Sequence, residues 1–148
     1  MPSFASATRR PFALCGAVLT AAIVMAGSAM ARPKTLDLAL DRPTDQRIFR
    51  VRIDSQITPI PLSRVHQWRV HLTDQAGLPI SGAELRIDGG MPEHHHGLPT
   101  APRATPADTP GDYVINGMKF SMRGWWVLKL SIKTTDGRAD HIAFNLVL

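Results

Sequence analysis

The sequence predicts an all-β fold, an immunoglobulin-like antiparallel β-sandwich of about seven strands preceded by a signal peptide. After residue 31 the chain consists of short segments in which apolar and polar residues alternate, which is the pattern of half-buried strands. Turn residues such as Asp74–Gly77 and Thr134–Gly137 separate these segments. No stretch of this part has the periodicity of an amphipathic helix. Short alternating strands without helices are typical of two packed sheets.

Each predicted strand is identified by its own alternation. In residues 126–132, for example, every second side chain is Trp, Leu or Ile, so these side chains share one face. The segment Asp88–Gly90 is expected to end the fourth strand. The residues before Tyr113 resemble a tyrosine corner, in which the hydroxyl bonds to nearby backbone. In chain order the predicted strands are 35–40, 49–53, 65–72, 83–87, 113–115, 126–132 and 142–148.

The first 31 residues predict export. Arg9 and Arg10 precede an apolar run at residues 11–26, and small residues up to Ala31 form a cleavage site. The run is shorter than the roughly 20 residues that a membrane span needs, which disfavours a retained anchor. Cleavage after Ala31 leaves a periplasmic or secreted domain at residues 32–148 without a stable membrane span. The paired arginines also fit a twin-arginine signal, but the general Sec route is favoured.

Charge and cysteine content narrow the function classes. Two of the 17 basic residues and none of the 12 acidic ones lie in the first 31 residues, which leaves the mature chain at +3. The arginines are scattered and no basic helix or stacking motif accompanies them, so we expect no nucleic-acid partner. The single cysteine, Cys15, lies in the signal peptide. The mature domain must therefore be stabilised by its core, without disulfides.

The most unusual stretch is MPEHHHGLPT, which begins at Met91. It lies in a proline-rich segment, residues 89–111, where no strand is predicted, and a connection this long suggests function. In an extended backbone His94 and His96 point to the same side and His95 points away. Two imidazoles on one side can hold zinc, copper, iron or nickel. The alternative interpretation is a solvated loop whose histidines bind nothing.

The methionines favour copper among these metals. Only Met91, Met118 and Met122 follow the signal peptide, and each lies close in sequence either to the histidines or to the strand that begins at Tyr113. Thioethers are soft ligands that favour copper(I), and imidazole accepts both copper oxidation states. Met118 and Met122 share a face if their stretch is extended. They could also be fillers of the core, and zinc is the alternative metal.

The remaining candidate residues carry weaker signals. His66 shares a face with Trp68 and is expected to be a satisfied buried histidine, whereas His71 and His141 are expected on the surface. The mature chain has no cysteine nucleophile and no G-x-S-x-G, H-E-x-x-H or glycine-rich phosphate loop, so we predict no enzymatic activity. A zinc enzyme would need His66 or His141 as a third imidazole near the pair.

Two motifs resemble the YtkA-like/FixH-like group of small exported domains. They are M-P-x-H-x-H-G at residues 91–97 and F-x-M-x-G-x-W at residues 120–126, and the resemblance extends over roughly residues 48–148. It implies an immunoglobulin-like sandwich on the outer face of the cytoplasmic membrane. Some relatives occur in copper-handling or cytochrome-oxidase-assembly settings, which implies a partner protein of that kind.

The leading hypothesis is a periplasmic copper-binding or copper-delivery domain. His94 and His96 would be its ligands, with His95 as an alternate and with sulfur from the three methionines. The alternative hypothesis is an interaction module that docks on a redox or membrane partner through the proline-rich loop and Trp125, with incidental histidines.

Overall fold

The computed structural model describes residues 31–148, and these residues form nine strands and no helix. Apart from Ala31, the predicted signal peptide lies outside this part of the chain. No helix long and apolar enough to cross a membrane occurs in residues 31–148. The strands are β1 (Asp41–Pro43), β2 (Phe49–Ser55), β3 (His66–Asp74), β4 (Glu84–Met91), β5 (His96–Gly97), β6 (Arg103–Pro106), β7 (Asp112–Met118), β8 (Trp125–Lys133) and β9 (Ala139–Val147).

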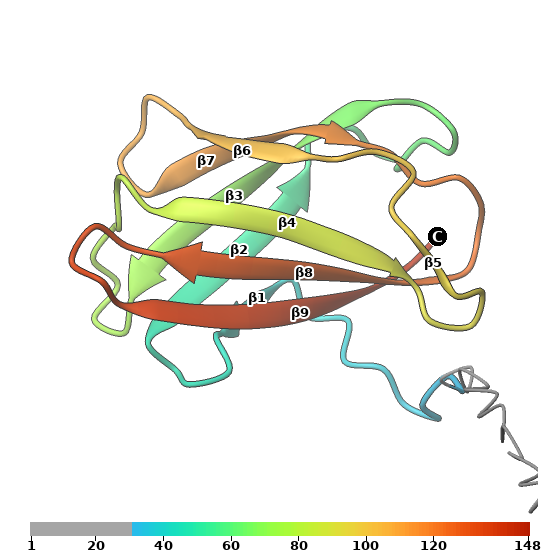
Figure 1. Cartoon of the computed structure of the whole chain (residues 1–148), viewed down its shortest axis with the longest axis horizontal. Helices are drawn as coiled ribbons and strands as arrows, with labels where there is room; N and C mark the ends of the chain where they lie inside the picture. The colour runs from blue at the N-terminus through green and yellow to red at the C-terminus, as the bar shows by residue number, and fades with distance from the viewer. Residues whose placement is uncertain (1–30) are drawn as a thin grey trace, which may run out of the picture.

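The strands form two layers that face each other across the core (Figure 1). One layer has the order β2-β3-β7-β6 and the other the order β4-β8-β9, with antiparallel pairing throughout. This is the strand order of a constant-type immunoglobulin domain. The predicted sandwich of about seven strands is thus confirmed, and the short β1 and β5 are additions. Strand β6 also pairs with β4 between Arg86 and Arg103, which closes one side of the sandwich.

The core consists of the alternating apolar residues that the sequence indicates. In β2 the side chains of Phe49, Val51 and Ile53 are buried, and the residues between them are exposed. Trp68 from one layer and Trp126 from the other are both fully buried. Burying each large apolar side chain stabilises the fold by about 1.5–3 kcal/mol. A domain of this size therefore has a sufficient core without a disulfide.

One predicted strand does not form, and one predicted strand end is wrong. Residues 35–40 form no strand, because they lie beyond the edge of the sheet, where the Leu40 carbonyl accepts one hydrogen bond from the Ile53 amide (2.8 Å). Strand β4 does not stop at Asp88 but continues to Met91. Its glycines mark a close approach of neighbouring backbones instead of a strand end, since a Cβ at Gly90 would lie 2.3 Å from the His96 carbonyl oxygen.

The predicted structureless connection at residues 89–111 is also wrong. It contains the end of β4 and the short strands β5 and β6. Strand β5 has only two residues and β6 is mostly exposed, so neither has enough alternation to be seen in the sequence. The segment therefore folds back onto the sheet over much of its length.

The Tyr113 hydroxyl does not form a tyrosine corner. It donates a hydrogen bond to the Ile80 carbonyl (2.8 Å) and accepts one from the Ala83 amide (2.9 Å), and both partners precede it by at least thirty residues. The predicted bond to nearby backbone is thus replaced by one that joins β7 to the connection between β3 and β4. Both backbone groups are satisfied by a single buried hydroxyl.

Asp140 connects the two edges of the sandwich at the end opposite the histidines. Burial raises the pKa of its carboxyl group, but the nearby Thr44 side chain and the backbone amides of His141, Gln46 and Ile48, which donate to the carboxylate, together hold the pKa below its ordinary value. The carboxylate therefore fixes the turn before β2 against β9.

Candidate functional site

The three histidines lie on a β-hairpin at one end of the sandwich, the His hairpin (residues 91–97). Met91 at the end of β4 pairs with His96 in β5, and residues 92–95 form the turn between them. The His94 amide donates to the Met91 carbonyl (3.0 Å), and His95 has a φ of 53° in the left-handed region. The extended backbone expected for these histidines is therefore wrong, because a tight turn replaces it.

The turn nevertheless brings His94 and His96 together. Their rings are stacked with centroids 6.0 Å apart and an interplanar angle of 29°, and all three histidines are exposed. An ion bound at about 2 Å by one nitrogen of each ring would separate the two centroids by roughly 5–6.5 Å. The observed separation of 6.0 Å lies within this range.

The protonation of His96 also fits metal binding. Its Nδ1 lies 3.1 Å from the Gly97 carbonyl oxygen, which assigns the proton to Nδ1 and leaves the lone pair on Nε2. Metal-binding histidines commonly donate their second nitrogen to a backbone carbonyl in this way, which fixes the tautomer and the ring orientation. The rings of His96 and Trp126 also pack in a T-shaped arrangement, with centroids 5.5 Å apart. His96 is thus held in place by the fold although it is exposed.

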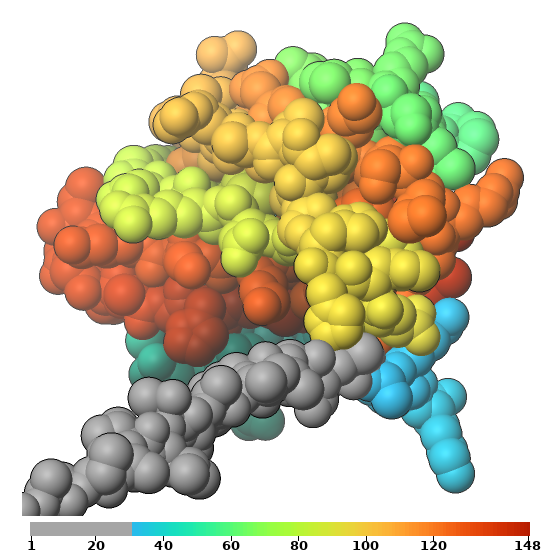
Figure 2. All heavy atoms as spheres, turned by 45° about the vertical axis from the view of Figure 1, so that its right-hand side comes forward, coloured from blue at the N-terminus to red at the C-terminus, as the bar shows by residue number. Residues whose placement is uncertain are grey.

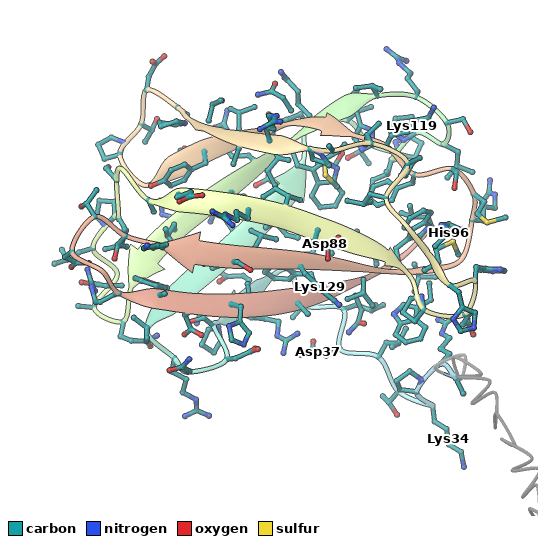
Figure 3. The ribbon with its side chains drawn as sticks, in the orientation of Figure 1. Lys34, Asp37, Asp88, His96, Lys119 and Lys129 are labelled. Atoms are coloured by element: carbon teal, nitrogen blue, oxygen red, sulfur yellow. The ribbon has the colours of Figure 1, made fainter. Side chains whose placement is uncertain are left out.

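The His hairpin borders a shallow hollow of about 320 Å³ on the outer face of β4 and β8. Asp88 and Lys129 are cross-strand partners there, and Figure 3 shows them side by side on the sheet, with His96 at its end. No sequence pattern points to these two charged residues, since only the pairing of β4 with β8 brings them to the hairpin. The hollow is lined by Asp88, Gly89, Gly90, Met91, Pro92, His95, His96, Val127 and Lys129.

The three methionines occupy different environments. Met91 is buried with its methyl group against Gly124, where an added Cβ would lie 2.6 Å from it. Met118 is fully buried in the core, whereas Met122 is 42% exposed. The expected shared face of Met118 and Met122 is therefore absent, because β7 ends at Met118 and the chain bends at residues 122–124. Of the three, Met91 is the one that lines the hollow beside His96.

The other histidines do not extend the pair into a larger cluster. His66 is buried and satisfied as predicted, since its Nε2 accepts a hydrogen bond from the Trp68 indole (2.9 Å) and its Nδ1 donates to a backbone carbonyl. His71 is only partly exposed, and its Nδ1 lies 2.5 Å from Asp112 Oδ1. His141 is exposed as predicted. Residues 31–148 contain no group of three or more His, Cys, Asp or Glu side chains that could hold a metal ion.

Trp125 is not available as a contact surface. It is only 4% exposed, and its indole nitrogen donates to Asn145 Oδ1 (2.9 Å). The prediction that Trp125 contacts a partner is therefore wrong, and the adjacent Trp126 is buried as well. Of the two features named for the docking hypothesis, only the proline-rich loop is left.

Comparison with known proteins gives a family and a fold. The model of the YtkA-like family matches residues 49–131. The chain is similar to the crystal structure of a DUF4426 family protein from Pseudomonas aeruginosa PAO1, with a TM-score of 0.51 and 14% identity, covering 68% of this chain and 90% of that one. A similarity to the C-terminal domain of ZirS has a TM-score of 0.38 and 10% identity, covering 100% of this chain and 88% of that one, and is too weak to support an argument. No curated protein matches the chain.

Proposed function

The chain belongs to the YtkA-like family, and we propose that it is an exported, non-catalytic protein that binds copper at the His hairpin. The observation that carries the proposal is the stacked pair of His94 and His96, whose ring separation of 6.0 Å suits one shared ion. The pair is exposed, so an ion can reach it without opening the core.

The ligand chemistry favours copper over zinc. Two imidazoles leave further coordination positions on the ion. Among the methionines, Met91 is the cross-strand partner of His96. A thioether is a poor zinc ligand but a good ligand for copper(I). Met122 is the exposed sulfur, at 42%, whereas Met91 and Met118 are both buried, so either would bind an ion only if its surroundings opened. His95 is the alternate imidazole.

An incomplete ligand set suits transfer better than storage. An ion held by two imidazoles and one thioether keeps a position for a ligand from another protein. We therefore propose delivery of copper to a copper-handling or cytochrome-assembly partner in the periplasm. Export itself is tested by isolating the protein from the periplasmic fraction, where its N-terminal residue should be Arg32 if cleavage follows Ala31.

The copper proposal is tested with the processed protein after copper loading and mild dialysis. We expect the wild type to retain copper and His94→Ala/His96→Ala to lose it. His141→Ala is the matched control, because His141 is exposed but lies on β9 outside the hairpin. Trp126 gives a second readout, since a copper(II) ion on His96 would lie close enough to quench its fluorescence. Equal copper retention by the wild type and the double variant would refute the proposal.

A further inference from the structure

Exposed aliphatic side chains gather at the end of the sandwich that carries the His hairpin. Ile57 (37% exposed) and Val65 (57%) lie in the connection between β2 and β3, and Met122 (42%) lies in the connection between β7 and β8. We call residues 56–65 and 119–124 the loop platform. Figure 2 turns this end of the molecule forward and shows the green and orange segments of the two connections next to each other.

The two connections form one surface because hydrogen bonds join them. The Ser63 amide donates to the Phe120 carbonyl (2.7 Å), and the Ser63 hydroxyl donates to the Ser121 carbonyl (3.2 Å). Leu62 and Phe120 also form an isolated β-bridge. Phe120 is fully buried, so it anchors the platform to the core. The exposed side chains are thus presented by a fixed scaffold.

The platform is positively charged. It contains Arg64, Lys119 and Arg123 and no aspartate or glutamate, and Figure 3 shows Lys119 at this end. None of the three forms an ion pair with another residue of the described chain, 31–148. A groove of about 640 Å³ lies at the foot of the platform, lined by Arg123, by Asp54 and by apolar residues such as Ile60 and Leu62. The platform thus carries three cations and three exposed apolar side chains on two connections that are bonded to each other.

We propose that the loop platform binds the surface of an anionic lipid bilayer. Its aliphatic side chains would enter the boundary between headgroups and acyl chains, and its cations would pair with lipid phosphates. Every Tyr, Trp and Phe in residues 31–148 is buried, so the exposed apolar groups of the platform are Ile, Val and Met side chains. The charge and the aliphatic character of the platform thus favour a lipid partner. The proposal does not depend on copper binding.

The test uses the chain that begins at Arg32, which retains all nine strands. Binding is measured on phosphatidylcholine vesicles with and without phosphatidylglycerol. We expect binding only with phosphatidylglycerol, and Lys119→Gln/Arg123→Gln should weaken it about 25-fold, roughly fivefold for each cation. The control, Lys129→Gln/Lys133→Gln, removes the same charge from the face of β8 and should weaken binding far less.

A fluorescent label distinguishes insertion from simple charge attraction. The chain from Arg32 contains no cysteine, so Met122→Cys can be labelled at a single position with an environment-sensitive dye. Its emission should shift to the blue on anionic vesicles, and that of labelled Lys133→Cys should not. Absence of binding to anionic vesicles, an equal loss in the control pair or an unchanged Met122→Cys label would each overturn the proposal. Failure to bind vesicles would leave a protein partner as the explanation of the platform.

Discussion

Gly90→Ala should displace the His hairpin from the sheet. A Cβ at Gly90 would lie 2.3 Å from the His96 carbonyl oxygen and 2.9 Å from the Gly97 Cα. Both neighbours are backbone atoms that cannot rotate away, so β5 must separate from β4. Gly97→Ala is the matched control, because Gly97 is the direct partner of Gly90 and its added Cβ would meet nothing closer than 3.4 Å.

The size of the effect follows from two costs. Overpacking at a site that cannot relax costs about 1–3 kcal/mol, and each backbone hydrogen bond lost with β5 adds about 1 kcal/mol. We therefore expect Gly90→Ala to lower the free energy of unfolding by about 2–4 kcal/mol. For a domain of this length that corresponds to a fall in Tm of about 8–16 °C. Gly97→Ala should lower the free energy of unfolding by less than about 1 kcal/mol.

Urea unfolding and thermal melts of the two variants measure this difference, and copper retention measures its effect on the site. Gly90→Ala should also weaken copper binding, because the displaced β5 carries His96 away from His94. Gly97→Ala should bind copper like the wild type. If the two variants were equally stable, the close approach of backbones would not be the reason for a glycine at position 90.

Two further predictions concern buried polar groups. Asp140→Asn should lower the free energy of unfolding at pH 7 by about 2 kcal/mol, since charge-assisted hydrogen bonds are lost. Because the folded pKa of Asp140 lies below its ordinary value of 3.8, the difference from wild type should be complete above that pH and vanish as the pH falls through the folded pKa, which urea unfolding at several pH values would show. Tyr113→Phe should cost about 1–3 kcal/mol by leaving the Ile80 carbonyl and Ala83 amide without their partner. A Tm within one degree of wild type would contradict this second prediction.

Much of the fold could be predicted because alternation depends on local sequence. Residues in β2, β3, β8 and β9 read as strands since one face of each is buried against the other layer. The end of β4 could not be predicted in this way. Glycines usually weaken a strand, and only the approach of Val127 and His96 to that backbone explains why Gly89 and Gly90 continue one.

The candidate site was predicted in composition but not in geometry. The histidines were identified as possible ligands by their residue type, but the reason given for their proximity was an extended backbone. In the structure the turn at residues 92–95 pairs His96 with Met91 and stacks it on His94. The methionines show the same limit, because Met118 and Met122 are neighbours in sequence but differ completely in burial.

The sequence by itself determined which side chains face the core and which His and Met side chains the chain carries, because both depend on residue type and local alternation. Only the tertiary structure decided which of these groups meet. Strand register places Met91 opposite His96 and Asp88 beside Lys129, while the core encloses Met118. Such contacts join segments that are distant in sequence or depend on the exact path of a turn, and no local pattern encodes either.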